Sequence, residues 1–190
     1  GGGLPEYSFN LIAGGPGSGK TTLAHQIMFA NATTERPALY FTVLGEPTLK
    51  MLRYQRQFNY FDPELAGSAI QFINLSTEVM ERDLGEVLQR IVGEIERTKP
   101  GIVVVDSFRT IAGFRQTGES GLYDLDQFVQ RLALHLTTWE VTSFLLGEYA
   151  AEDQRNPVFT VADGILWLAQ ATDRNSVVRK LQVVKSRGRA

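Results

Sequence analysis

The stretch Leu11–Thr22, LIAGGPGSGKTT, runs from apolar residues into a glycine cluster and ends on a lysine and two threonines. Glycine occupies four of the six positions from Gly14 to Gly19. Ordering a glycine costs more conformational entropy than ordering any other residue, so such a cluster indicates backbone that bends sharply or approaches a ligand closely. The ligand that this setting favours is a phosphate group.

Residues 14–21 match the pattern G-x-x-x-x-G-K-[ST] of a phosphate-binding loop. The loop follows a strand-like run, Phe9–Ala13, and opens a helix-like segment, so backbone N–H groups and a helix N-terminus would converge on a di- or triphosphate. In this role Lys20 reaches the β and γ phosphates and Thr21 ligates Mg²⁺. The alternative is a glycine-rich turn with an incidental lysine. The predicted nucleotide-binding residues are Gly14, Gly15, Pro16, Gly17, Ser18, Gly19, Lys20, Thr21 and Thr22.

A carboxylate for the metal follows a second apolar run. The β-branched residues Ile102–Val105 predict a buried strand, and Asp106 stands at its carboxyl end. Ligands of open α/β sheets bind at that end of the strands, where an aspartate can hold Mg²⁺. A strand that ends in aspartate is also compatible with a simple turn or cap.

Strand-length apolar runs alternate with helix-patterned segments along most of the chain. The runs are almost continuously apolar, which is typical of parallel strands buried on both faces. The last two runs, residues 162–170 and 176–186, flank the turn-forming residues 171–175 and predict an antiparallel hairpin. The expected fold is α/β: a mostly parallel twisted sheet flanked by helices, with a C-terminal antiparallel hairpin.

Composition narrows the class of protein. The 190 residues favour one domain, 1–190, and the glycine start and strand-like end lead us to expect a domain excised from a longer polypeptide. The formal net charge of −2 provides no global field for nucleic acid or an anionic membrane. The chain has no cysteine, which suits the reducing cytoplasm, and no apolar run approaches the length of a membrane span. We therefore expect a soluble, cytoplasmic protein.

Several motifs together resemble the RecA-like ATPases, and within them the KaiC family. Residues 1–24 are similar to that family's entry into the phosphate loop, IVVVDS (102–107) to its Walker B strand, and residues 162–170 with 179–190 to its closing hairpin. The resemblance implies a ring, usually a hexamer, with ATP at each subunit boundary. It also implies that Lys185 and Arg187 reach across to the γ-phosphate of the neighbouring subunit. Without the resemblance, these basic residues read as a solvated strand end.

One departure from the family affects catalysis. Clock-type members carry two adjacent glutamates after the second strand, whereas here Leu44 and Gly45 take those positions and only Glu46 remains. Glu46 is either the general base for the attacking water or a cap of the following helix. Glu148, after the run SFLLG, either positions water at the sheet edge or is an exposed loop acid. ATP binding is therefore the firmer expectation, and hydrolysis is expected to be slow.

Two other classes of function compete with a simple ATPase. A recombinase-like DNA-dependent ATPase would bind DNA through residues 113–121 and 150–157, but these segments lack the basic and aromatic surface that single strands need. An ATP-gated module would recruit signalling proteins to a ring with little hydrolysis. The sequence therefore predicts no nucleic-acid partner. It does not distinguish an ATP-gated module from an ATPase.

Overall fold

The computed structural model describes residues 3–43, 48–80, 84–107, 120–149 and 157–188, and strands and helices alternate along most of them. The strands are β1 (Phe9–Gly14), β2 (Ala38–Thr42), β3 (Ile70–Asn74), β4 (Ile102–Asp106), β5 (Thr142–Gly147), β6 (Gly164–Asp173) and β7 (Ser176–Ser186). The helices are α1 (Lys20–Asn31), α2 (Thr48–Gln55), α3 (Ser76–Met80), α4 (Leu84–Thr98), α6 (Ser120–Thr138) and α7 (Pro157–Val161). None of these helices has the length and apolar character needed to cross a bilayer.

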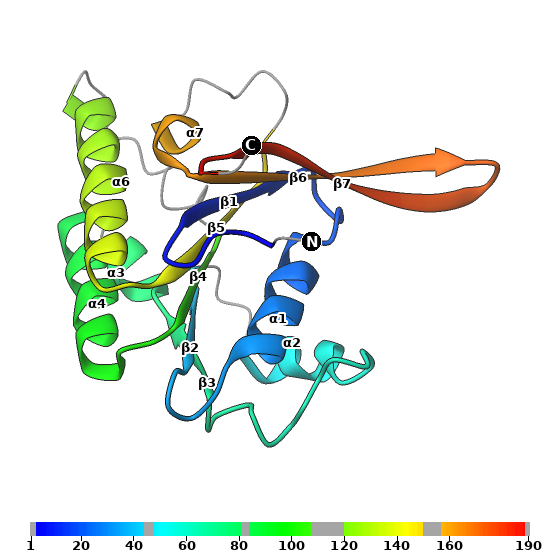
Figure 1. The fold of residues 1–190 in the computed structure, drawn as a ribbon, viewed down its shortest axis with the longest axis horizontal. Helices are drawn as coiled ribbons and strands as arrows, with labels where there is room; N and C mark the ends of the chain where they lie inside the picture. The colour runs from blue at the N-terminus through cyan, green and yellow to red at the C-terminus, as the bar shows by residue number, and fades with distance from the viewer. Residues whose placement is uncertain (1–2, 44–47, 81–83, 108–119, 150–156, 189–190) are drawn as a thin grey trace.

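The strands form one sheet in the order β3-β2-β4-β5-β1-β6-β7. Neighbouring strands from β3 to β6 are parallel, and β6 and β7 pair antiparallel. Figure 1 shows the sheet nearly edge-on, with α3, α4 and α6 on one side and α1 and α2 on the other. The predicted fold class, a mostly parallel sheet flanked by helices with a closing hairpin, is confirmed.

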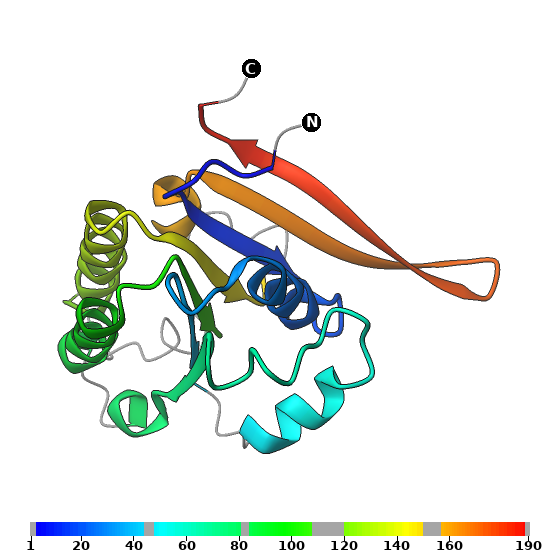
Figure 2. The same cartoon turned by 60° about the horizontal axis from the view of Figure 1, so that its bottom comes forward.

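Each face of the sheet carries its own hydrophobic core. Along β1, Phe9, Leu11 and Ala13 pack with α4 and α6, while Ile12 packs with α1. Successive strand residues point to opposite faces, so a strand with a core on both sides must be apolar at nearly every position. Figure 2 shows the two helical layers on either side of the strands. Burial of the strands on both faces thus explains the continuous apolar runs in the sequence, as predicted.

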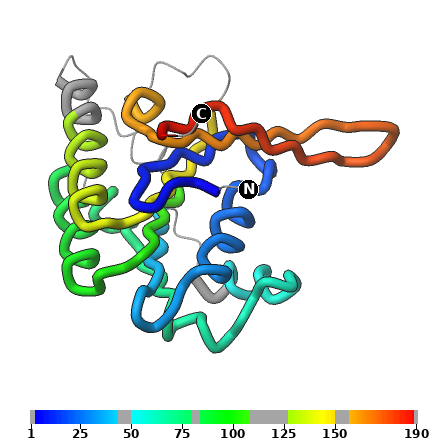
Figure 3. Tube along the Cα trace, in the orientation of Figure 1, coloured from blue at the N-terminus to red at the C-terminus, as the bar shows by residue number. Residues whose placement is uncertain are grey.

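The β6–β7 hairpin projects beyond the layered core as a twisted ribbon (Figures 1 and 3). Strand β6 continues to Asp173, so the turn is only Arg174–Asn175, shorter than the predicted 171–175. Both turn residues have positive φ, 43° and 65°, as a tight two-residue hairpin requires. Strand β7 has five aliphatic side chains that are 37–57% exposed: Val177, Val178, Leu181, Val183 and Val184.

Strand β6 lies very close to the last residue of β1, where the glycine-rich loop begins. Gly14 pairs with Leu168 of β6, and a Cβ on Gly14 would lie 2.1 Å from the Leu168 carbonyl oxygen. Its φ of 149° is also rarely adopted by residues with side chains. Only glycine fits this position without moving β6.

We predict that Gly14→Ala lowers the free energy of unfolding by about 2–4 kcal/mol, through overpacking and backbone strain. Gly15→Ala is the matched control, because a Cβ at Gly15 has no neighbour within 4 Å. Urea denaturation of the nucleotide-free variants measures both changes. Equal loss of stability in the two variants would contradict the assignment of strain to Gly14.

Candidate nucleotide-binding site

The glycine-rich loop connects the end of β1 to the start of α1, as the sequence predicts. Gly17 and Gly19 adopt left-handed backbone conformations with φ of 70° and 101°, and Gly19 is the residue that precedes the helix. These conformations favour glycine and turn the chain tightly into the helix. The N–H groups of the first turn of α1 therefore face the loop, where a helix N-terminus favours an anion.

A cavity of about 860 Å³ opens at this edge of the sheet. The loop and α1 form one wall, and the ends of β2 and β4 form another. The predicted residues Gly17, Ser18, Gly19, Lys20, Thr21, Thr22, Asp106 and Glu148 all line it, together with Leu23, Gln26, Tyr40, Thr42, Met51, Phe58, Ser107, Leu168 and Arg179. The structure thus brings the phosphate-loop motif and the aspartate of β4 into one site.

Lys20 is buried, and its ammonium group is held inside the loop. Its Nζ donates to the carbonyl oxygens of Gly14 at 3.0 Å and Gly15 at 2.8 Å. Burial lowers the pKa of Lys20, and the Glu148 and Asp106 carboxylates oppose that shift by stabilising the ammonium form. The loop therefore holds a cation at the place where phosphate oxygens would need one.

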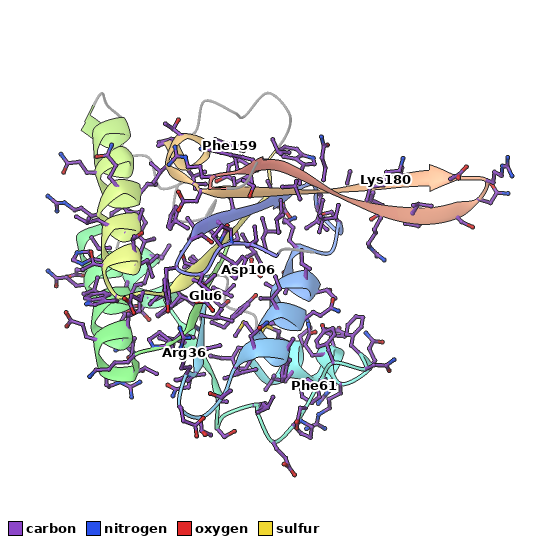
Figure 4. The ribbon with its side chains drawn as sticks, in the orientation of Figure 1. Glu6, Arg36, Phe61, Asp106, Phe159 and Lys180 are labelled. Carbon is purple, nitrogen blue, oxygen red and sulfur yellow. The ribbon has the colours of Figure 1, made fainter. Side chains whose placement is uncertain are left out.

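The Thr21 hydroxyl donates a hydrogen bond of 2.8 Å to Oδ2 of Asp106. The Tyr40 hydroxyl donates to the same oxygen. A hydroxyl and a carboxylate are oxygen donors of the kind that Mg²⁺ takes, and Mg²⁺ usually completes its shell with water and phosphate oxygens. Among the described residues there is no group of three or more His, Cys, Asp or Glu side chains that could hold a metal ion. Figure 4 labels Asp106, which joins the end of β4 to the first turn of α1.

Two further features of the loop fit a bound phosphate. The Ser18 hydroxyl is buried, and no described residue forms a hydrogen bond with it. Buried hydroxyl groups normally have a partner, so this orphaned group fits a ligand that accepts hydrogen bonds. Gly15 and Gly17 are exposed, so the loop backbone is open to a ligand.

The other predicted residues fall into three groups. Gly14, Gly15 and Pro16 belong to the loop but are not among the residues that line the cavity. Lys185 and Arg187 are not among the cavity residues of the described chain. Glu46 lies outside the described residues. The structure thus joins the loop, Asp106 and Glu148, and does not bring the basic strand end to the same cavity.

Lys185 and Arg187 are instead anchored to α7 and to the start of β6. Lys185 Nζ donates to the carbonyl oxygens of Phe159 at 3.2 Å and Thr160 at 3.0 Å. Arg187 donates to the Thr160 carbonyl oxygen at 3.1 Å and lies 3.4 Å from the Asp163 carboxylate, with 56% of its side chain exposed. Asp163 also accepts from the Phe9 N–H at 3.0 Å, so it ties β7 to β1.

Arg179 and Tyr40 are two of the nine cavity residues listed above that the sequence did not predict. Arg179 reaches the cavity from β7, where its Cδ would lie 3.6 Å from a Cβ on Gly19. Tyr40 reaches it from β2 through its hydroxyl. The only sequence signal for Tyr40 is a phenol within a buried apolar strand, because a buried phenol needs a hydrogen-bond partner. The sequence carries no signal for Arg179, because the pairing of β6 and β7 decides its position.

His25 is fully buried behind the site. Its ring lies 4.7 Å from the Tyr40 ring and 6.0 Å from the Phe72 ring, measured between centroids. Burial lowers the pKa of His25 to about 4, although the Asp106 carboxylate acts in the opposite direction. The imidazole is therefore neutral at pH 7, and it serves as a packing residue against the sheet.

The fold and the site together define a phosphate-loop protein of the RecA type. Over residues 1–190 the chain matches the family model described as "ATPase: KaiC", and the chain belongs to this family. A solved structure of a KaiC-like protein from the hyperthermophilic archaeon Pyrococcus horikoshii OT3 superposes with a TM-score of 0.78 at 22% identity, over 98% of this chain and 82% of that chain. This similarity supports the fold.

Curated relatives match part of the chain. The DNA repair protein RadA of Mycolicibacterium smegmatis is 32% identical over 121 residues, which cover 64% of this chain and 22% of that protein. A UPF0273 protein of Thermotoga maritima is 28% identical over 127 residues, 58% of this chain and 51% of the relative. The aligned part is thus about a fifth of the RadA protein and about half of the Thermotoga one.

The buried imidazole predicts a pH dependence of stability. Unfolding returns the pKa of His25 from about 4 to its ordinary value of about 6.5, so the unfolded state binds an extra proton between these pH values. The His25 contribution to the free energy of unfolding therefore rises with pH across this window, by up to about 3 kcal/mol. We expect His25→Phe to flatten the stability profile between pH 4 and 6.5.

The measurement is urea denaturation at several pH values in that window. His135→Phe is the matched control, because His135 is a less buried histidine whose ring stacks on Trp139. An equal change of slope in both variants would contradict the role of burial at His25.

Proposed function

We propose that this chain binds ATP with Mg²⁺ at the phosphate loop and hydrolyses it slowly. The observation that carries the proposal is the hydrogen bond between Thr21 and Asp106 at the base of the cavity. It joins the hydroxyl expected to ligate the metal to the carboxylate expected to hold the metal's water shell.

Each residue of the site has a defined role in this proposal. The loop N–H groups and Lys20 would bind the phosphates, and Thr21 and Asp106 would hold Mg²⁺. When bound, Mg·ATP would supply the phosphoryl group and offset part of its charge. The Gly14 and Gly15 carbonyls already orient the Lys20 ammonium, so the side chain would need little rearrangement when phosphate binds.

Water activation is assigned to a carboxylate at the same edge. Glu148 lines the cavity and lies close enough to Lys20 for its carboxylate to oppose the lowering of the Lys20 pKa by burial, which supports a role near the phosphates. Glu46, which directly follows the positions of the family's paired glutamates, is the second candidate for the general base. Because Leu44 and Gly45 take the places of that pair and only Glu46 remains, we propose slow turnover.

We also propose that the nucleotide site is completed by a second copy of the chain. Lys185 and Arg187 are held on α7 and Asp163, away from the cavity of their own chain. If they contact nucleotide, they therefore do so on a neighbouring subunit, where a guanidinium would clamp phosphoryl oxygens.

The projecting hairpin supports self-association. A two-stranded ribbon is only marginally stable alone, and this one exposes five aliphatic side chains of β7. Exposed apolar patches of this kind mark interaction surfaces. We propose that they are covered in a ring of subunits, with a hexamer as the expected size.

A second candidate function is a DNA-dependent ATPase, because the RadA relatives are named as DNA repair proteins. The two segments predicted to contact DNA in such a protein lie almost entirely outside the described residues. The formal charge of −2 argues against strong non-specific binding. An ATP-gated module that recruits signalling proteins is the third candidate.

One pair of measurements separates the three candidates. Light scattering with and without Mg·ATP reports assembly, and steady-state hydrolysis with and without single-stranded DNA reports activity. A slow ATPase turns over without DNA, a recombinase-like enzyme is stimulated by DNA, and a gated module assembles with little turnover.

Lys20→Ala should weaken ATP binding about 100-fold or more, because hydrogen bonds to charged groups contribute about 1.5–3 kcal/mol each. Asp106→Asn should instead reduce the effect of Mg²⁺ on binding and leave metal-free affinity nearly unchanged. Isothermal titration calorimetry in Mg²⁺ and in EDTA measures both. Unchanged affinity in Lys20→Ala would refute the phosphate role of the loop.

Arg187→Ala should reduce hydrolysis and leave ATP binding to an isolated subunit intact. Mixing it with Lys20→Ala should restore activity, because mixed rings pair an intact loop with an intact arginine. Lys180→Ala, an exposed cation on the same strand, is the control and should keep full activity. Inactive mixed rings, beside active wild-type rings, would rule out a shared site.

A further inference from the structure

The Asp106 carboxylate receives two hydrogen bonds on a single oxygen. Thr21 Oγ1 and the Tyr40 hydroxyl both donate to Oδ2, and among the described residues no bond to Oδ1 is formed. Two donors from different elements, α1 and β2, fix the plane of the carboxylate more firmly than one donor does. The second oxygen is thereby left for the ligand side of the site.

The placement of Tyr40 follows from the sheet register. Strand β2 pairs in parallel with β4, so Tyr40 lies opposite Val104 and Thr42 opposite Asp106. Tyr40 and Asp106 therefore share the face of the sheet that α1 covers, two residue positions apart along the paired strands. The phenol reaches along the strand to the carboxylate at the edge.

Helix α1 packs against the Tyr40 ring and holds it in place. His25 stands one helical turn after Thr21, so both side chains lie on the helix face that meets the sheet. The His25 ring packs 4.7 Å from the Tyr40 ring, and Phe72 of β3 lies 5.5 Å from it. Tyr40 is 1% exposed and still lines the cavity, so its hydroxyl can neither turn to solvent nor leave the carboxylate easily.

We propose that Tyr40 is a positioning residue that orients the Asp106 carboxylate for the metal ion of the nucleotide site. This inference rests on the proposed function, because it assigns the metal to Asp106. Tyr40 acts through Asp106 and has no direct contact with nucleotide in this role. Groups that hydrogen-bond a metal-binding carboxylate set its orientation and its basicity, and their loss weakens metal affinity.

A purely structural role would give a different result. In that case the hydroxyl only satisfies the hydrogen-bonding needs of a buried phenol, and its removal affects the loop as a whole. Nucleotide affinity would then change equally with and without metal. The dependence of nucleotide affinity on Mg²⁺ therefore distinguishes a positioning role of Tyr40 from a purely structural one.

The test is Tyr40→Phe, which keeps the ring contacts with His25 and Phe72 and removes only the hydroxyl. We expect ATP affinity in EDTA to stay within about twofold of wild type, while the Mg²⁺ concentration at half-maximal binding rises about tenfold, the low end for partners of metal ligands. In hydrolysis, half-maximal Mg²⁺ should rise in parallel while kcat at saturating Mg²⁺ changes little. Tyr60→Phe is the matched control, because it removes a phenol hydrogen bond to Gln55 outside the cavity.

Each outcome has a defined meaning. If Tyr40→Phe binds like wild type in Mg²⁺, or loses affinity equally in Mg²⁺ and EDTA, the positioning role is overturned. A Tyr40→Phe chain that does not fold also overturns it, because the hydroxyl is then a requirement of the fold. If wild type itself binds no ATP, or binds it without response to Mg²⁺, the proposed function fails, and the inference fails with it for that separate reason.

Discussion

The hydrogen bond from Thr21 to Asp106 joins residues 85 positions apart in the chain, and the architecture of the site depends on it. It forms because the loop after β1 and the end of β4 reach the same edge of the sheet. That edge is common to all parallel strands, so connections after different strands meet there. The bond ties the first turn of α1 to the end of β4.

Burial sets the electrostatics around this bond. The Lys20 ammonium is desolvated, and two carboxylates, Glu148 and Asp106, help it to keep its proton. His25, one turn along α1 from Thr21, is neutral because its burial is more complete. This edge of the sheet therefore carries the oriented Lys20 ammonium among carboxylates, with a neutral aromatic layer behind it. Such an arrangement suits an anionic ligand with its metal ion, and it keeps the charges at the surface of the cavity.

The base of the β6–β7 hairpin and its outer part have different surroundings. Its base is tied to the core by Asp163, which bonds to β1 and to Arg187, whereas its outer part has exposed aliphatic side chains. Its inner face still reaches the loop through Arg179, next to Gly19. Figure 4 labels Lys180 on the projecting part of the ribbon. One element thus links the candidate nucleotide site to the surface that we propose meets a neighbouring subunit.

The sequence by itself determined the local elements and the chemical class of the loop. Short-range sequence patterns encode the GGPGSGKT motif, the strands that are apolar on both faces, and helix 84–98. The positions of these elements in the chain could therefore be predicted from the sequence. Asp106 could be predicted because a strand end has a fixed relation to the sheet edge. The tertiary structure alone decided that Tyr40 reaches Asp106, that Arg179 reaches Gly19, and that Lys185 and Arg187 bind α7 in their own chain. Those contacts depend on strand order and register, which arise from the packing of distant segments and leave no periodic trace in the sequence.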